Sequence, residues 1–457
     1  MQHIPLNIKK LSLLIGDVVV LYASLYFTLF VRYGEAPSQI LWQQHLWPFS
    51  AIFAIWLIIF YISDLYNLIT ATNNSKFYAL TTEALFVNFL IGTAFFYLIP
   101  NLAITPKRNL FIVVVITTIL FLIWRQLFNI TLKSLLPKQN IAIIGLNSQV
   151  RELIKYFNDH PHLGFRIAFI LFDKEYDEQG TFNIKIYKDI KNIKKYVKQE
   201  RINTIVLAGN LQRTNELRSC LFSCLALRVE FITLFNFYSK TLGKISLHSV
   251  NQMWFMENLN RGGILWFDKF KRTYDIILAI VIFITTLPFW PLIALFIKIG
   301  SKGPMLYKQE RIGKNNETFN LIKFRSMIEG DNNRQPTVHN DARVTRFGRF
   351  IRRTRIDELP QVINIIKGDM SFIGPRPERP ELVQKLQEEI PFYNERTLVV
   401  PGVTGWDQVC GEYHSPTLDD TLKKLQYDLY YIKNRSLFMD LIIILKTLRT
   451  VLMGGGV

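Results

Sequence analysis

Residues 274–299 read YDIILAIVIFITTLPFWPLIALFIKI, an apolar stretch that contains Pro288 and Pro291. An α-helix of about 20 apolar residues spans the hydrocarbon core of a bilayer, so this stretch is long enough to cross. Proline lacks the N–H that continues an α-helix, and its ring clashes with the preceding turn. The sequence therefore predicts a membrane helix over about 274–299 that is broken at Pro288 and Pro291.

The charges around this stretch bear on whether it crosses the membrane. Lysine and arginine lie on both sides of it, at Lys269, Lys271, Arg272, Lys298 and Lys302. Positive charge at both ends favours a re-entrant helix, which turns at the break and returns to one anionic membrane surface. The alternative is a kinked fifth span, which would place the last third of the chain on the side opposite to the part before it.

Four further apolar stretches occupy the first third of the chain, at residues 11–31, 47–66, 84–99 and 110–127. Each approaches the length of a membrane span, although the third is short and contains Asn88. Basic residues flank the group at Lys9, Lys10, Arg125, Lys133 and Lys138. The positive-inside rule then places both ends in the cytoplasm, although Lys107 and Arg108 on the predicted outer loop count against this. We expect a four-helix transmembrane bundle in residues 1–136; buried helices of a soluble protein are the alternative.

Composition agrees with a multidomain membrane protein. The chain has 457 residues, more than the roughly 250–300 at which a single core stops growing. A hydrophobic fraction of 49% and a net charge of +18 are typical of a membrane protein with basic cytosolic parts. The charge is not gathered in a tail, so we expect no nucleic-acid partner. Cys220, Cys224 and Cys410 form neither a metal-binding pattern nor an even disulfide set, which indicates a reducing compartment.

Residues 137–264 change to short β-rich runs that alternate with polar helical ones. Strands are predicted near residues 141–144, 167–172, 204–207 and 230–234, with a helix over 150–157. Strands that alternate with helices predict a parallel, Rossmann-like α/β sheet. A dinucleotide fingerprint needs two more glycines after Gly145, and the sequence lacks them. We therefore expect a degenerate Rossmann-like domain with a structural or regulatory role rather than an NAD site.

The last third of the chain holds compact polar motifs, KFRSM at 323–327, IDELPQ at 356–361, GPRP at 374–377 and PGVTGW at 401–406. Carboxylates framed by arginines suit chemistry on a phosphate ester, because arginines hold phosphate oxygens while a carboxylate attacks phosphorus or holds a metal. On a helix, the side chains of Asp357 and Glu358 would diverge by about 100°. That divergence suits a division of labour, with one carboxylate attacking and the other binding Mg²⁺. Taken alone, such a pair is more often a surface feature.

Six arginines precede this pair, at Arg343, Arg346, Arg349, Arg352, Arg353 and Arg355. Spacing of three places most of them along one helical stripe. The stripe can touch lipid headgroups, line a phosphate site or simply face solvent. We expect mixed use, with the later arginines facing the site, because the stripe leads directly into Asp357 and Glu358.

Two loops and a helix complete the pattern. The prolines of GPRP fix the backbone, so Arg376 is held either to grip an anion or as the exposed arginine of a structural turn. Trp406 fits a core position or a functional position equally well. Residues 437–452 predict an amphipathic helix on the membrane surface, with Lys446 and Arg449 on its polar face.

In this order, the motifs resemble those of the bacterial sugar transferase family, the monotopic polyprenyl-phosphate glycosyl-1-phosphate transferases. That family initiates exopolysaccharide, capsule or O-antigen synthesis. The resemblance runs from about Lys271 to the end of the chain and includes QERIG at 309–313 and GDMS at 368–371. Four spans and a degenerate Rossmann-like domain in front are similar to the large-form members. One departure is Asp407, where family members usually have a small residue, and it puts a loop near the acceptor in doubt.

The resemblance implies an activity and a location. The family transfers a sugar-1-phosphate from a UDP-sugar to undecaprenyl phosphate, releases UMP and is thought to form a covalent phosphosugar-aspartate. It implies a catalytic domain in residues 265–457, mainly helical, on the cytoplasmic face of the bacterial inner membrane. Glucose, galactose and an N-acetylated sugar are not distinguished, and a hexose is the default. Such a chain can form a homo-oligomer, although no residue pattern requires one.

Residue roles follow from the same resemblance. Asp357 is the expected nucleophile and Glu358 its partner, and both are expected to bind Mg²⁺. Basic positions expected to hold the donor are Lys323, Arg325, Arg352 and Arg376, and Asp440 matches a late family aspartate expected near the substrate. Two rival functions are a membrane-bound NAD-dependent nucleotide-sugar modifying enzyme and a non-catalytic membrane adaptor. The missing glycines count against the first, and carboxylates inside an arginine frame count against the second.

Overall fold

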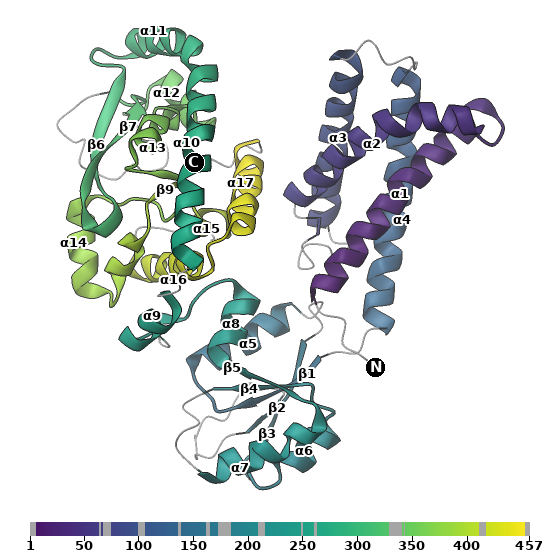
Figure 1. The fold of residues 1–457 in the computed structure, drawn as a ribbon, viewed down its shortest axis with the longest axis vertical. Helices are drawn as coiled ribbons and strands as arrows, with labels where there is room; N and C mark the ends of the chain where they lie inside the picture. The colour runs from purple at the N-terminus through teal and green to yellow at the C-terminus, as the bar shows by residue number, and fades with distance from the viewer. Residues whose placement is uncertain are drawn as a thin grey trace. The chain divides into compact units, whose positions relative to one another are not determined.

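The computed structural model describes residues 6–63, 65–66, 75–98, 106–135, 139–160, 165–171, 184–208, 215–247, 250–259, 263–328, 341, 343–410 and 417–452. The chain divides into two compact units, Met1–Leu234 and Phe235–Val457, and each is described by itself (Figure 1). In the described part, five helices are long and apolar enough to cross a membrane. Four of them belong to the first unit and one to the second.

The first unit begins with four long helices, α1 (Leu6–Tyr33), α2 (Gln39–Ile62), α3 (Ser75–Leu98) and α4 (Pro106–Leu135). They contain nearly all of the four apolar stretches predicted from the sequence. Helix α1 packs against α2 and α4, and α3 packs against the same two helices. Buried aromatic side chains such as Trp56, Phe60 and Phe121 fill the space between them. Their arrangement as a bundle that crosses a membrane stays a prediction.

A buried ion pair joins α1 to α4. Arg125 Nη2 lies 2.6 Å from Asp17 Oδ2, and Arg125 Nη1 donates to the carbonyl of Leu65 at 2.7 Å. Both charged side chains are at most 1% exposed, and pairing is what allows charges to persist among apolar helices. The prediction that Arg125 is a flanking charge at the end of a span is wrong, because Arg125 lies inside α4 and is buried. The side chains of the other charges used for orientation, Lys9, Lys10, Lys107, Arg108, Lys133 and Lys138, lie outside the described residues.

A five-stranded sheet follows, with strand order β3-β2-β1-β4-β5 and every pairing parallel. The strands are β1 (Gln139–Ile144), β2 (Phe165–Leu171), β3 (Lys185–Tyr187), β4 (Thr204–Leu207) and β5 (Glu230–Thr233). The helices α5 (Ser148–Asp159), α6 (Ile193–Gln199) and α7 (Asn215–Ser223) alternate with them. The predicted parallel sheet is confirmed, while β3 was missed because three residues give too short a pattern.

The turn after β1 requires glycine. Gly145 has a φ of +97°, and a Cβ at this position would lie 2.2 Å from the carbonyl oxygen of Ala208. A side chain would therefore clash with the backbone that follows the neighbouring strand β4. The glycine is explained by the packing of the sheet, without any need for a bound dinucleotide.

The second unit is mainly helical and carries two small pairs of strands. Its helices are α8 (Leu234–Leu242), α9 (Gln252–Leu259), α10 (Gly263–Thr286), α11 (Trp290–Gly300), α12 (Arg346–Arg353), α13 (Gln361–Lys367), α14 (Pro380–Glu389), α15 (Trp406–Cys410), α16 (Leu418–Asn434) and α17 (Leu437–Leu452). The strands β6 (Leu306–Ile312) and β7 (Thr318–Phe324) form an antiparallel hairpin, and β8 (Ser371–Ile373) pairs with β9 (Gly402–Thr404) in parallel.

The segment before α10 packs into the core of this second unit. Ile245, Val250 and Trp254 are buried in one cluster with side chains of α14 and α16. Trp406 also contacts this segment, because its Nε1 donates to the carbonyl of Gly243 at 2.7 Å. Trp406 is therefore a packing residue here. The α/β domain predicted from the sequence extends to residue 264, whereas in the structure these contacts join residues 235–259 to the second compact unit.

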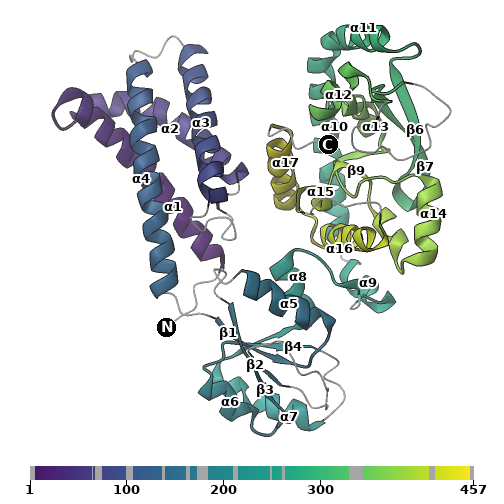
Figure 2. The ribbon, with the colours of Figure 1, turned by 180° about the vertical axis from the view of Figure 1, so that it is seen from behind.

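The long apolar helix of the second unit is interrupted where the prolines lie. Leu287–Phe289 form a 3₁₀ turn that contains Pro288, and Pro291 lies in the first turn of α11. Helices α10 and α11 run in different directions in both views (Figures 1 and 2). Large apolar side chains such as Ile284 and Ile299 remain exposed along both helices. The interruption occurs at the predicted place, and the return to one membrane face stays a prediction.

Candidate active site

One face of the β6–β7 hairpin forms a wall of a cavity of about 260 Å³. Residues two apart on a strand share a face, and Tyr307, Gln309 and Arg311 of β6 all line this cavity. Lys323 lies opposite Tyr307 on β7 and lines the cavity as well. The basic side chains in its wall are Arg311, Lys323, Arg325, Arg343, Arg352, Arg376 and Arg379, and Asp357 is its only acidic one among the described residues.

Helix α12 is held against the end of β7 by backbone contacts. The backbone N–H of Thr345 donates to the carbonyl of Ser326 at 3.2 Å, and the Thr345 hydroxyl caps the helix by accepting from the N–H of Gly348 at 2.8 Å. A Cβ on Gly348 would lie 1.9 Å from the Ser326 carbonyl oxygen, so only glycine allows this approach. The contact positions the arginines of α12 relative to the cavity.

The arginine stripe divides between solvent and site. Arg346, Arg349 and Arg353 are exposed, whereas Arg352 is half-buried and lines the cavity. Arg355 is also half-buried and has a φ of 58°, a left-handed conformation that is uncommon for a residue with a side chain. It introduces the 3₁₀ turn Ile356–Glu358.

This turn sends two adjacent carboxylates into different cavities. Successive side chains on a 3₁₀ helix point about 120° apart. Asp357 lines the basic cavity, whereas Glu358 lines a second cavity of about 190 Å³. Arg376, from the loop after β8, lines both. The divergence expected from the sequence is therefore present, with a 3₁₀ turn in place of an α-helix.

Asp357 is buried and only partly hydrogen-bonded among the described residues. The residue is 7% exposed, and its Oδ1 has no hydrogen-bond partner within the described part of the chain. The pKa of Asp357 is raised to about 6, chiefly by burial and also by the neighbouring Glu358 charge, against the opposing charges of Lys323 and Arg352. At neutral pH the carboxylate is mostly ionised, and its buried Oδ1 has no hydrogen-bond partner among the described residues.

Glu358 has the opposite environment. Arg376 Nη2 donates to Glu358 Oε1 at 2.9 Å, and Arg355 Nη1 lies 3.4 Å from the same oxygen. Burial alone would raise the pKa of Glu358, but the guanidinium groups of Arg376 and Arg355 outweigh it and lower the pKa. Glu358 therefore stays ionised and holds both arginines beside Asp357.

Buried hydrogen bonds from Arg396 hold the backbone of the loop that carries Arg376. Arg396 Nη2 donates to the carbonyl of Arg376 at 3.0 Å and to Asp428 Oδ2 at 2.8 Å. Arg396 Nη1 donates to the Tyr393 hydroxyl at 2.7 Å. These buried bonds explain why Arg376 is held in place, as the prolines of its loop predict.

The other predicted basic residues have distinct surroundings. Burial and the charge of Arg376 lower the pKa of Lys323 to about 8, so it can lose its proton in mildly alkaline solution. Arg325 lines the cavity, yet its guanidinium donates to the carbonyls of Ser301 and Lys302 at 2.8 and 2.9 Å. Arg325 thus also joins β7 to the end of α11.

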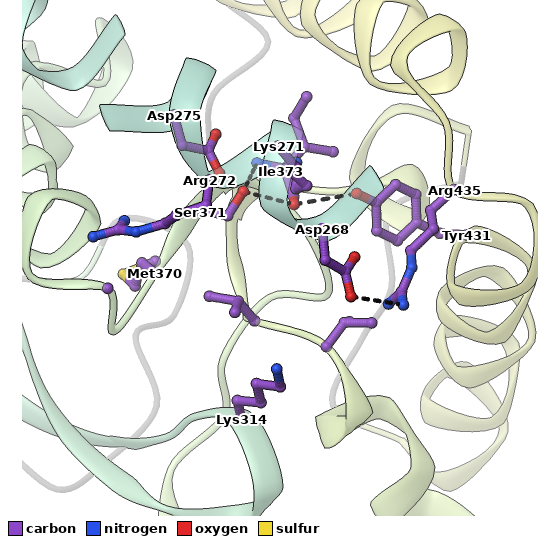
Figure 3. A pocket seen from close by; sticks show the side chains of 13 residues that line it. Asp268, Lys271, Arg272, Asp275, Lys314, Met370, Ser371, Ile373, Tyr431 and Arg435 are labelled. Atoms are coloured by element: carbon purple, nitrogen blue, oxygen red, sulfur yellow. Dashed lines mark hydrogen bonds and ion pairs between the residues drawn. The ribbon is translucent and has the colours of Figure 1, made fainter. Parts of the chain in front are cut away.

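Asp440 is not part of this cavity. It is 1% exposed on α17, where Lys271 Nζ donates to its Oδ2 at 2.6 Å and Tyr431 donates to its Oδ1 at 2.9 Å. The Tyr274 hydroxyl donates to the same carboxylate. Lys271 and Tyr431 line a separate cavity of about 220 Å³, which Figure 3 shows together with the ion pair of Asp268 and Arg435. The structure therefore places Asp440 in a buried network between α10, α16 and α17.

Several residues of the basic cavity were not predicted as site residues from the sequence. These are Tyr307, Gln309, Arg311 and Arg379. A signal existed for three of them, because positions 307, 309 and 311 alternate along a strand that pairs with Lys323. Arg379 lies outside the regular elements next to the cavity, so periodicity could not have found it, whereas Arg343 belongs to the arginine stripe predicted from the sequence.

Comparison with known protein families matches both units. A family described as bacterial sugar transferase matches residues 266–454, which include every residue of the basic cavity. A family described as CoA-binding domain matches residues 61–234.

Individual relatives agree with these matches. Over 188 residues the chain is 46% identical to the UDP-N-acetylgalactosamine-undecaprenyl-phosphate N-acetylgalactosaminephosphotransferase of Aeromonas hydrophila, covering 41% of this chain and 44% of that protein. It is 30% identical over 320 residues to the UDP-glucose:undecaprenyl-phosphate glucose-1-phosphate transferase of Escherichia coli (strain K12), covering 68% and 67%. It is 39% identical over 197 residues to the exopolysaccharide production protein PSS of Rhizobium leguminosarum bv. phaseoli, covering 40% and 96%.

Proposed function

The chain belongs to the bacterial sugar transferase family, and from this premise we propose that it transfers a sugar-1-phosphate from a UDP-sugar to undecaprenyl phosphate. The observation that supports this best is a buried aspartate in a cavity lined by seven basic side chains, with one oxygen that has no hydrogen-bond partner among the described residues. Such a cavity suits a diphosphate, because guanidinium groups bind phosphate oxygens in pairs. The reaction would begin exopolysaccharide, capsule or O-antigen synthesis.

We propose that Asp357 is the nucleophile. One of its carboxylate oxygens attacks the phosphorus that carries the sugar, and the bond from that phosphorus to the bridging oxygen breaks. UMP leaves with the electron pair of that bond, and a phosphosugar-aspartate remains. Lys323, Arg352 and Arg376 hold the phosphate oxygens on which negative charge builds up. Glu358 keeps Arg376 in position through the 2.9 Å hydrogen bond.

The residues fit a Mg²⁺ ion. Magnesium commonly takes one or two carboxylates and completes its shell with substrate phosphates and waters. Asp357 would supply a carboxylate from the basic cavity, and its Oδ1 has no hydrogen-bond partner among the described residues. Glu358 lines the other cavity and is paired with Arg376 and Arg355, so it would act on the ion only through those arginines. When bound, the ion would neutralise charge on the donor diphosphate. Within the described residues no three acidic, histidine or cysteine side chains form a larger metal cluster.

We further propose how the chain sits in the bacterial inner membrane. Helices α1 to α4 cross it as a four-helix bundle, and α10 and α11 form a re-entrant helix that turns at Pro288. This arrangement keeps the catalytic unit on the cytoplasmic face, where nucleotide sugars are made. The apolar side chains exposed along α10 and α11 support insertion of these two helices into the lipid bilayer.

Release of UMP tests the proposal. The purified chain, in nanodiscs with undecaprenyl phosphate and Mg²⁺, is given a panel of UDP-sugars beside the Asp357→Asn variant. Turnover of one sugar by the wild type alone is expected, and it would also identify the donor, since the relatives' names include both UDP-glucose and UDP-N-acetylgalactosamine. A folded wild type that releases no UMP from any sugar would overturn the proposal and favour a membrane adaptor. NAD-dependent change of a sugar nucleotide would support the remaining rival.

A further inference from the structure

The second cavity, which Glu358 lines and which is called the apolar cavity below, differs from the basic cavity in the side chains that line it. Its volume is about 190 Å³, and apolar side chains form much of its wall. These are Ile282 of α10, Leu359, Val362 and Ile365 beside the 3₁₀ turn, and Phe372, Val403 and Val409. Three threonines, Thr404, Thr447 and Thr450, complete the side towards α17. Apart from Arg376, which lines both cavities, and Glu358, which positions it, the proposed binding of a UDP-sugar uses no residue of this cavity.

The two cavities meet at the carboxylate pair. Arg376 lines both of them, while Asp357 lines the basic one and Glu358 the apolar one. At this end of the apolar cavity, two guanidinium groups from Arg355 and Arg376 surround a single carboxylate. The local charge is therefore positive, and it lies beside the proposed nucleophile.

The other end of the apolar cavity lies between two helices with apolar surfaces. Ile282 comes from α10, and Thr447 and Thr450 come from α17, which lies beside α10 in both views (Figures 1 and 2). Val281 and Ile284 of α10 and Leu448 of α17 are exposed next to these positions. A hydrocarbon chain could leave the cavity along these surfaces without entering water.

We propose that this cavity is the acceptor site and that it holds the phosphate end of a polyprenyl phosphate. This inference rests on the proposed function. The phosphate lies at Arg376 and Arg355, and the first apolar units of the lipid pass between α10 and α17. A ligand with one charged end and a long apolar body matches this distribution of residues, whereas a UDP-sugar, polar along its whole length, does not.

The position of the site explains the second half of the reaction. A phosphate oxygen of the acceptor attacks the phosphorus of the phosphosugar-aspartate. The bond between that phosphorus and the Asp357 oxygen breaks, and its electron pair returns to the carboxylate. Because the two cavities share Arg376, donor and acceptor approach Asp357 from different sides, and UMP can leave without displacing the lipid.

Filling the apolar cavity tests the site. Thr450→Phe places a ring in its wall, and Thr421→Phe on α16 is the control. Both threonines are half-buried in helices, and each donates its hydroxyl to the carbonyl four residues earlier, yet Thr421 lines neither cavity. Two rates are measured for each variant: single-turnover UMP release without acceptor, and steady-state turnover as undecaprenyl phosphate is varied.

For Thr450→Phe we expect the KM for undecaprenyl phosphate to rise at least tenfold, while acceptor-free UMP release stays within twofold of wild type. Thr421→Phe should change neither rate. An unchanged KM in folded Thr450→Phe protein, or a parallel fall in both rates, would overturn the acceptor site. Failure of the proposed function would look different, because the wild type itself would then release no UMP.

A second measurement does not depend on turnover. A photoreactive undecaprenyl phosphate analogue is bound to the Asp357→Asn variant in nanodiscs, and the labelled peptides are identified. Labels on α10 and α17 that excess undecaprenyl phosphate removes, and that the phospholipid of the nanodisc does not, support the site. Labels confined to other segments, or labels that phospholipid removes equally well, would overturn it.

Discussion

Arg376 donates a 2.9 Å hydrogen bond to Glu358, while the adjacent Asp357 keeps its Oδ1 without a partner among the described residues. Two neighbouring carboxylates thus have different hydrogen-bonding environments. Glu358 uses its charge to hold arginines, and the same arginines keep it ionised. Asp357 is buried, and one of its oxygens has no hydrogen-bond partner among the described residues. This is the state expected of a group that must form a bond to an incoming atom.

The first prediction concerns Asp357→Asn. An amide cannot attack phosphorus as a carboxylate does, so acceptor-free UMP release should fall on the order of 10⁴-fold or more. Asp357→Glu, which keeps the charge but moves it, should retain more activity than Asn. Equal release by Asn and wild type would remove Asp357 from the proposed role while leaving the reaction itself in place.

The same substitution should make the second unit more stable. Burial raises the pKa of Asp357 from 3.8 to about 6, so ionisation of this carboxyl destabilises the folded unit by about 3 kcal/mol. The loss develops as pH rises from about 4 to about 6 and is complete above that range. Asp357→Asn should therefore raise the thermal unfolding temperature at pH 8, with a smaller gain at pH 5. A lower unfolding temperature at pH 8 would contradict this account of the aspartate.

Much of this arrangement could be predicted from the sequence, and the reasons are local. Residues 274–299 contain both the apolar length and the prolines that determine where α10 ends. Most strands of the sheet were predicted from short β-rich runs. The turn at Gly145 was predicted as well, and the structure explains the glycine by its close approach to the backbone of Ala208. Asp357, Glu358 and Arg376 lie in two short motifs that are close together in the sequence. The sequence therefore indicated that these side chains could belong to one site.

Other features depend on contacts between distant segments. Arg125 looks like a flanking charge in one dimension, and only the packing of α1 on α4 brings it to Asp17. The two cavities likewise depend on segments that are separate in the sequence, namely the β6–β7 hairpin, the 3₁₀ turn Ile356–Glu358 and the loop after β8. Adjacency in sequence could not show that Asp357 and Glu358 line separate spaces, because that depends on the 3₁₀ turn introduced by the left-handed Arg355.

A third prediction concerns the pH dependence of the first half-reaction. Asp357 must be ionised to attack, so kcat/KM for the donor should fall tenfold per pH unit below about 6. Lys323 loses its charge above about 8, so kcat/KM should also fall on the alkaline side as donor binding weakens. Acceptor-free UMP release is the proper measurement, because a lipid phosphate itself titrates with a pKa near 6. A flat profile between pH 5 and 9 would contradict both assignments.

The acid side of that profile should move in opposite directions in two variants. Glu358→Gln removes a negative charge that raises the pKa of Asp357, so the acid limb should shift below pH 6. Arg352→Gln removes a positive charge that lowers the same pKa, so the limb should shift above pH 6. Both variants should lose activity, but the sign of the shift does not depend on that loss. Shifts of the same sign would show that another group controls the acid limb.

The last prediction separates a structural Asp440 from a substrate-binding one. Asp440→Asn leaves the Lys271 ammonium, whose side chain is 11% exposed, without its charged partner. Breaking a buried ion pair in this way costs about 3–5 kcal/mol, which corresponds to a fall of roughly 10 °C in the unfolding temperature of a unit this size. The KM for the donor should stay within twofold of wild type, because Asp440 lines neither cavity beside Asp357. A raised donor KM with an unchanged unfolding temperature would instead support the role that the sequence resemblance implied.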